Sequence, residues 1–472
     1  MVKKMEDRTQ IIRLYDIFAK LCQYIVAGNT KNYLVRYGCI SSREKDRVKT
    51  KIESNTPLKR GENGRFIRAK RNDICESYVN QIEDFSNKLM KSDDNNCIMG
   101  MVQALDGTLD KILKEEIRHL QTLDSTRELN SNRTSTGIGL LPRCDCVWAR
   151  KSRMSYSYRR LDNYLKHFMV MEDRVLYEIQ DNHIFLPKGF FQKFDKNKKL
   201  NVAASPVTSK PNFSIDRYEN NDFKVFSINY DSSKMNEDNQ LIWDKICEAG
   251  KNGTEVIVFP EMLGNPLTDE YIISKLENLA DEERTDIPDM IVLPSVYNDN
   301  QNTCLVLDKY GNQLAKQYKQ NPFVMNTDEG DYMEDIIGQN VVNVFHYEGI
   351  GRFAILICKD FLTTRYMERI MRGFMLTLII VPSYSTGAYD FKTSFDLCAH
   401  DYCNVIWINS CAAMTPGKEM NFENIGYIRK RITRYDDESE ALYNMKPCRG
   451  LFEGHCDKSC IYYDSFGGKN EI

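Results

Sequence analysis

The sequence contains no apolar run as long as a membrane span, which needs about 20 apolar residues in succession. It begins Met-Val-Lys-Lys-Met-Glu-Asp, without the apolar core of a secretory signal. Its 15 cysteines are an odd number without regular spacing, which argues against the disulfide framework of a secreted protein. This pattern favours reduced thiols, and we expect a cytoplasmic protein with no membrane partner.

The sequence also lacks cysteine and histidine groups with the spacing of a zinc site. The groups that come nearest are Cys144-Asp-Cys146 and, late in the chain, Cys448, His455, Cys456 and Cys460. We therefore expect neither a metal nor a cofactor. No RNA- or DNA-binding motif is present either.

The charges are distributed unevenly along the 472 residues. Residues 1–220 hold 40 Lys+Arg against 28 Asp+Glu, a balance of +12, and residues 221–472 hold 24 against 39, a balance of −15, which together give the −3 of the chain. A shift of this size marks a domain boundary. We predict a basic, mostly helical accessory or assembly domain at 1–200, a linker at 201–221 and an α/β domain at 222–472.

The spacing of apolar residues in the first half predicts amphipathic helices over residues 8–26, about 73–91 and about 94–123. Residues 42–72 are polar and basic, and we expect them to form an exposed loop. From Tyr156 to Phe168 aromatic residues alternate with cationic ones, as on a surface that binds single-stranded nucleic acid. The interpretation that we favour is a basic face that docks on the acidic half of the same or another subunit.

Buried strands in the second half end at polar residues. Residues 223–229, 239–249 and 256–259 predict a strand, a helix and a second strand, hence a parallel βαβ unit. Glu261 comes directly after this second strand. Another apolar run begins at Arg352 and ends in Cys358-Lys-Asp360. Because α/β sheets present functional groups at the carboxyl ends of strands, Glu261 and Cys358 are candidate site residues.

Three motifs in order resemble the Glu-Lys-Cys triad of the nitrilase, or carbon–nitrogen hydrolase, superfamily: Phe-Pro-Glu261, Tyr-Lys319 and Ile-Cys358-Lys-Asp360. Lys316 is an alternative to Lys319. The segments around the motifs are also similar to those of the family, and the resemblance covers about residues 222–412. It implies an α/β fold of the nitrilase type, an α-β-β-α sandwich.

The chemistry of these residue types agrees with the resemblance. A cysteine attacks carbonyl carbons only as the thiolate, so Cys358 needs a base, and Glu261 can accept its proton. Lys319 can stabilise the thiolate and the developing oxyanion. The backbone N–H of Lys359 is the natural second oxyanion donor. The resemblance also implies a second glutamate that orients the lysine; Glu329 is the candidate, with Asp328, Asp331 and Glu334 nearby.

The sequence thus predicts cysteine-dependent hydrolysis of a non-peptide carbon–nitrogen bond in a small molecule, through a thioester, with an amide favoured over a nitrile. One alternative is transfer of the acyl group to an acceptor other than water. Another is a scaffold or assembly protein of the same fold, as in bacterial antiviral systems, with secondary or lost catalysis. The resemblance further implies a homo-oligomer, from a dimer to a filament. Nucleic acid is a less favoured partner of the basic half.

Overall fold

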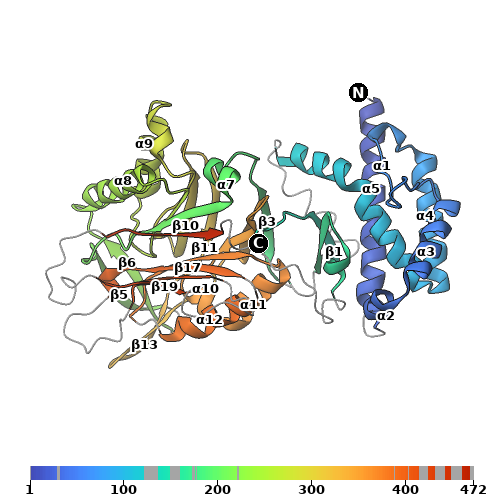
Figure 1. Cartoon of the computed structure of the whole chain (residues 1–472). Coiled ribbons are helices and arrows are strands. Elements are labelled where there is room, and N and C mark those ends of the chain that lie inside the picture. The colour runs from blue at the N-terminus through green and yellow to red at the C-terminus, as the bar shows by residue number, and fades with distance from the viewer. Residues whose placement is uncertain are drawn as a thin grey trace. The chain divides into compact units, whose positions relative to one another are not determined.

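The chain divides into two units in the computed structural model (Figure 1), which describes residues 2–28, 32–121, 137–148, 160–172, 176, 178–220, 223–386, 389–401, 403–413, 424–430, 442–447 and 460–467. The first unit comprises residues 1–143 and 150–177, and the second comprises residues 144–149 and 178–472. No helix among the described residues is long and apolar enough to cross a membrane.

The first unit is mostly helical, as expected. Its elements are α1 (Val2–Ala27), α2 (Tyr33–Cys39), α3 (Ser42–Asn55), α4 (Glu76–Ser92), α5 (Asn95–Gln121) and the antiparallel strands β1 (Ile138–Pro142) and β2 (Phe168–Glu172), with short 3-10 helices at Arg71–Asp73 and Leu161–Tyr164. Helices α1, α4 and α5 confirm the three amphipathic helices. The apolar stripes of α1 and α5 are buried in one core that includes Phe18 and Leu105.

Helix α3 forms where we expected a loop. The Ser41 side chain accepts a hydrogen bond from the backbone N–H of Glu44, which caps the first turn. Val48 and Ile52 are buried against the core of the unit. Two apolar residues four positions apart and a cap were sufficient to form the helix, although the segment is polar overall.

The described residues of the second unit form two seven-stranded sheets and a four-stranded sheet. In the first large sheet the strands are β4 (Lys199–Ala204), β7 (Val256–Val258), β8 (Met290–Val292), β9 (Val296–Asn298), β10 (Gln301–Asp308), β11 (Gln313–Tyr318) and β20 (Tyr462–Gly467). In the second they are β3 (Gln180–Phe185), β14 (Val341–Tyr347), β15 (Gly351–Ile355), β16 (Leu378–Ser383), β17 (Asn404–Asn409), β18 (Gly426–Arg429) and β19 (Leu442–Met445). The small sheet has β5 (Phe213–Asn220), β6 (Phe223–Tyr230), β12 (Val324–Thr327) and β13 (Gly330–Glu334).

Helices cover the two large sheets on their outer sides, and this confirms the α/β sandwich (Figure 1). The helices of the unit are α7 (Gln192–Asn197), α8 (Met235–Lys251), α9 (Thr268–Glu277), α10 (Lys359–Leu362), α11 (Thr364–Gly373) and α12 (Tyr389–His400), with 3-10 turns at Glu283–Asp286 and Cys411–Ala413. Helices α8 and α9 share a core with β7, β8 and β10. On the other side, the Phe391 ring of α12 lies 4.8 Å from the Trp407 ring of β17.

The two large sheets meet at β11 and β14. The backbone N–H of Asn343 donates to Gln317 Oε1 at 3.1 Å, and Asn343 Nδ2 donates to the Lys316 carbonyl at 2.9 Å. Strands β15, β16 and β17 are parallel neighbours whose residues are buried throughout, as expected for strands covered on both faces. This seam lies just before Lys319, and β15 leads to Cys358.

The expected βαβ unit is present, but its first strand was wrong. The strand before α8 that lies parallel to β7 is β4, with Val202 opposite Val256, and β6 pairs instead with β5 and β13 in the small sheet. Four residues of β4 are buried, whereas Phe223 at the start of β6 is 64% exposed. The more buried strand therefore joins the large sheet, and the β5–β6 hairpin is an insertion between β4 and α8.

The expected domain boundaries also need correction. Residues 201–221 are not a linker, because they include most of β4 and the whole of β5. Strand β3, from the expected first domain, pairs with β14, and Val147 donates its N–H to the Gly349 carbonyl at 2.7 Å. The polar composition that suggested a linker belongs to an exposed hairpin of the second unit.

Trp148 anchors the short segment 144–149 in the second unit. Its side chain is fully buried, its ring lies 6.3 Å from that of Phe194 and 6.0 Å from that of Phe466, and Nε1 donates to the Thr377 carbonyl at 3.3 Å. A large aromatic side chain in this setting contributes strongly to stability.

We predict that Trp148→Ala lowers the free energy of unfolding of the second unit by about 3–5 kcal/mol, because it leaves a cavity in the core. Urea titration followed by tryptophan fluorescence measures this, since the other two tryptophans, Trp243 and Trp407, lie in the same unit. Trp148→Phe, which keeps most of the ring contacts, should lose clearly less. A midpoint unchanged in Trp148→Ala would contradict the anchoring role.

Candidate active site

Three segments of the second unit bring Glu261, Lys319 and Cys358 into one buried cluster. Glu261 follows β7, Lys319 directly follows β11, and Cys358 follows β15. The three residues are 0%, 1% and 3% exposed. Charged side chains are seldom buried to this degree unless they are paired with one another.

The Lys319 ammonium lies between two carboxylates. Lys319 Nζ is 2.7 Å from Glu261 Oε1 and 2.5 Å from Glu334 Oε2. Asn302 connects the same two carboxylates, because its Nδ2 donates to Glu261 Oε1 at 2.9 Å and to Glu334 Oε1 at 3.0 Å. The other oxygen of Glu261, Oε2, accepts the backbone N–H of Tyr384 at 2.9 Å. Each buried charge therefore has a partner.

Lys319, rather than Lys316, makes this contact. Lys316 lies on β11 with its ammonium 6.0 Å from the Tyr318 ring centre. Neighbouring residues of a strand point to opposite faces. Because the strand ends at Tyr318, the direction of the Lys319 side chain is set by the segment that follows the strand.

The second glutamate at this site is Glu334, and the choice of Glu329 was wrong. The Glu329 side chain is 71% exposed and pairs with Arg217 at 3.5 Å. Asp328 and Asp331 are also exposed, whereas Glu334 is fully buried. Residues 328 and 329 form the tip of the β12–β13 hairpin, and Glu334 ends β13, where it pairs with Phe226 of β6.

Cys358 has a strained backbone, with φ 45° and ψ −100°. Residues other than glycine rarely adopt a positive φ, and such strain persists only where the surroundings impose it. Here the Cys358 N–H donates to the Pro382 carbonyl at 2.8 Å, and its carbonyl accepts the N–H of Phe361 at 3.0 Å. Lys359 follows as the first residue of α10, where backbone N–H groups have no acceptor within the helix.

Burial and charge set the protonation of the cluster. Burial raises the pKa of the Cys358 thiol well above its usual range, the Glu261 charge raises it further, and Lys319 opposes both. Burial also raises the pKa of Glu261, against the charge of Lys319. Burial would lower the pKa of Lys319, but the two glutamates outweigh it and raise that pKa. The thiol is therefore protonated at rest, beside a carboxylate whose proton affinity is also increased.

Sequence reasoning did not assign Asn302, Tyr384 or Asp360 to the site. Asn302 begins a segment that resembles the superfamily, so its position was a usable signal. Tyr384 contributes a backbone N–H to the cluster, which no residue pattern can indicate. Asp360 was part of the cysteine motif, without an assigned role. Among the described residues, no group of three or more His, Cys, Asp and Glu is suited to hold a metal ion.

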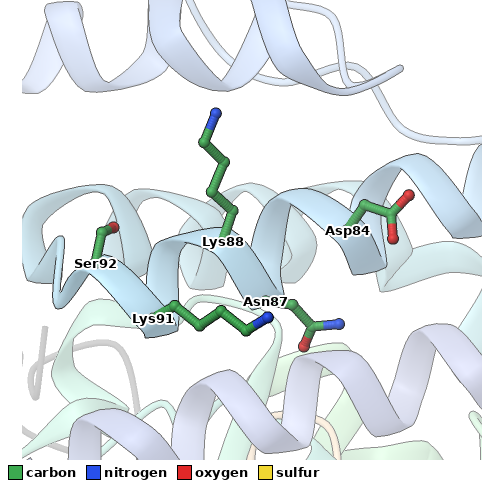
Figure 2. Close-up of a pocket in the computed structure, with 5 residues that line it drawn as sticks. All are labelled: Asp84, Asn87, Lys88, Lys91 and Ser92. Carbon is green, nitrogen blue, oxygen red and sulfur yellow. The ribbon is translucent and has the colours of Figure 1, made fainter.

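A surface hollow of about 520 Å³ lies in the first unit. Figure 2 shows the side chains around it, which come from α4: Asp84, Asn87, Lys88, Lys91 and Ser92. All five are exposed, and none is a nucleophilic cysteine or a buried acid.

Residues 151–159, which include part of the aromatic and cationic stretch, lie outside the described residues. That the stretch from Tyr156 to Phe168 binds nucleic acid, or docks on the acidic half, stays a prediction.

The charges around Cys358 predict opposite changes in its pH profile. The rate of alkylation by iodoacetamide should rise with pH to a midpoint above the ordinary thiol pKa of about 8.5. Glu261→Gln removes a negative neighbour and should move this midpoint to lower pH. Lys319→Met removes the positive neighbour and should move it to higher pH. Quantitative peptide mapping of Cys358 across pH measures both shifts, and shifts of the same sign would contradict the arrangement of charges.

No protein-family model and no curated protein matches the sequence. Among solved structures, the chain is similar to glutamine-dependent NAD+ synthetase from Acinetobacter baumannii (15% identity, TM-score 0.39), over 58% of this chain and 46% of that chain. It therefore spans less than half the length of that protein.

The chain is also similar to an amidase from Nesterenkonia sp. (14% identity, TM-score 0.37, over 57% of this chain and 90% of that chain). A third similar structure is the C. elegans NitFhit protein (16% identity, TM-score 0.34, over 49% and 56%). The Nesterenkonia AN1 amidase is a nitrilase-superfamily protein.

Proposed function

We propose that this protein hydrolyses the carbon–nitrogen bond of a small, non-peptide amide through a thioester on Cys358. The observation that carries the proposal is the buried cluster in which one ammonium, Lys319, is held between Glu261 and Glu334 next to the thiol. A nucleophile, a base and a fixed positive charge within one water-poor site are what acyl transfer to a cysteine needs.

In the first step Glu261 takes the proton of Cys358, and the thiolate attacks the carbonyl carbon of the amide. The carbonyl oxygen becomes an oxyanion, which the Lys319 ammonium and the backbone N–H of Lys359 stabilise. Burial raises the pKa of Glu261 as well as that of Cys358, so the carboxylate that accepts the thiol proton is a stronger base than a glutamate in water.

In the second step the carbon–nitrogen bond breaks. Glu261 gives its proton to the leaving nitrogen, so that a neutral amine or ammonia departs and a thioester remains. Glu261, again ionised, takes a proton from water, whose oxygen attacks the thioester carbon. Collapse of this intermediate releases the acid, and the proton held by Glu261 returns to the thiolate. One carboxylate thus acts twice as base and twice as acid.

Glu334 and Asn302 keep Lys319 and Glu261 in place during these steps. The Asn302 amide holds an oxygen of each carboxylate, and Glu334 pairs with the ammonium through its other oxygen, Oε2. An ammonium fixed in this way needs no reorganisation when the oxyanion forms.

Aromatic residues near the cluster are suited to select the acyl group. The Phe213 ring lies 5.4 Å from that of Tyr384 and 6.1 Å from that of Tyr230. Burial raises the pKa of Tyr230, and the charges of Glu261 and Glu334 raise it further, so both carboxylates act electrostatically on this hydroxyl. Phe213 and Tyr230 belong to the inserted β5–β6 hairpin, which we infer shapes the substrate side of the site.

Cys358→Ala should abolish ammonia release from a panel of small amides, and the wild type should show a thioester mass on Cys358 after rapid quenching. The matched control is Cys304→Ala, which removes another fully buried thiol, on β10, and should keep wild-type rates. Circular dichroism establishes that the variants fold alike. Equal ammonia release from wild type and Cys358→Ala would contradict the proposal. Thioester that turns over only with an added amine would indicate transfer.

The two glutamates provide a matched pair. Glu334→Gln should lower kcat/KM by roughly a hundredfold, because the ammonium loses the carboxylate that orients it. Glu329→Gln, five residues away at the hairpin tip, should leave kcat/KM unchanged. The kinetics of ammonia release measure both, and a larger loss in Glu329→Gln would reverse the assignment.

A further inference from the structure

Asp360 joins the segment that carries the thiol to the segment that carries the ammonium. Its side chain is fully buried, two residues after Cys358. Oδ1 accepts the backbone N–H of Gln320 at 3.0 Å, the backbone N–H of Asn321 at 2.8 Å and the Asn321 side-chain amide at 2.7 Å. Oδ2 shares the Gln320 N–H at 3.1 Å. All of these donors come from the two residues that follow Lys319.

The segment after Lys319 depends on this carboxylate. Strand β11 ends at Tyr318, and the Lys319 N–H makes one further bond to the Asn302 carbonyl at 2.9 Å. Residues 320 and 321 belong to no strand or helix, so their backbone N–H groups have no sheet partner. A buried N–H without an acceptor is costly, and Asp360 supplies the acceptor for both.

We propose that Asp360 is the positioning residue for Lys319: its carboxylate fixes the separation of the Lys319 ammonium and the Cys358 sulfur. This inference rests on the proposed function. Asp360 acts at the backbone on one side of Lys319, as Asn302 does on the other, whereas Glu261 and Glu334 hold the ammonium itself.

The electrostatics agree with an acceptor role. Burial raises the pKa of Asp360 to about 7, and the donors of Asn321 and Gln320 and the charge of Lys319 act in the opposite direction. Every hydrogen bond given above places an N–H donor on the carboxyl oxygens, as an ionised carboxylate requires.

The test measures the rate of alkylation of Cys358 by iodoacetamide in the full-length protein, with peptide mapping to separate this thiol from the other cysteines. Asp360→Ala should slow alkylation at neutral pH by about tenfold, since a displacement of about 1 Å at a reacting group costs up to about a hundredfold in rate. Lys319→Met should also slow it. The double variant should be no slower than Lys319→Met alone, because Asp360 acts through Lys319. Effects that multiply in the double variant would overturn the proposal.

Glu255→Ala is the matched control. Glu255 is another buried carboxylate that accepts backbone N–H bonds, from Phe194 at 2.6 Å and Asn201 at 3.1 Å, and burial raises its pKa to about 7 as well. It lies just before β7, whereas Glu261 lies beyond the other end of that strand. This variant should keep the wild-type alkylation rate, and Asp360→Asn, which keeps an acceptor oxygen, should recover much of the rate lost in Asp360→Ala.

Asn321→Ala removes one donor and leaves Asp360 intact, so it decides the question if Asp360→Ala fails to fold. Asn321→Ala should slow alkylation less than Asp360→Ala does. When it is combined with Lys319→Met, the rate should be no slower than in Lys319→Met alone. A wild-type rate in Asn321→Ala would overturn the positioning role. If Lys319→Met itself alkylates like wild type, the proposed triad fails together with this inference. If Lys319→Met is slow but the Asp360 and Asn321 variants are not, only this inference fails.

Discussion

A buried ammonium between two carboxylates is the constraint on which the site depends. Removing these charges from water costs several kcal/mol for each ion, and loss of one partner leaves a buried charge uncompensated, at about 3–5 kcal/mol. Glu261, Lys319 and Glu334 come from three segments, so the fold must hold all three in register. Hydrogen bonds made by Asn302, the Tyr384 backbone and Asp360 do this. Replacement of any of these bonds by a water molecule would loosen the cluster.

The small sheet has a role in this constraint. Glu334 ends β13, and β13 pairs with β6, which belongs to the hairpin inserted between β4 and α8. The insertion therefore supports a residue of the charged cluster as well as two aromatic residues near it. Strand β5 itself is exposed on the surface. Its partner strand, β6, is nevertheless coupled to the cluster through Glu334.

Local patterns predicted the parts of the site that lie at strand ends. Glu261 and Cys358 were found because a strand covered on both faces is a continuous apolar run, and its first polar residue marks its end. Glu334 was named only as an alternative to Glu329, because hairpin geometry decides which of several nearby acids turns inward. Strand β6 was predicted in the place of β4 because both segments contain enough apolar residues for a buried strand. Only their burial in the folded chain distinguishes the two. Helix α3 was missed because two buried residues are a weak signal.

The charge count of the cluster favours transfer of the thiol proton to Glu261 over its loss to solvent. With both carboxylates and Lys319 ionised, the four side chains carry one net negative charge. Release of the Cys358 proton to water would make this two in a buried site, and the raised pKa of the thiol reflects that cost. Transfer to Glu261 keeps the total at one and moves negative charge from oxygen to sulfur. Because the ammonium lies beside this carboxylate, the thiolate of the proposed reaction would form next to a positive charge that is already in place.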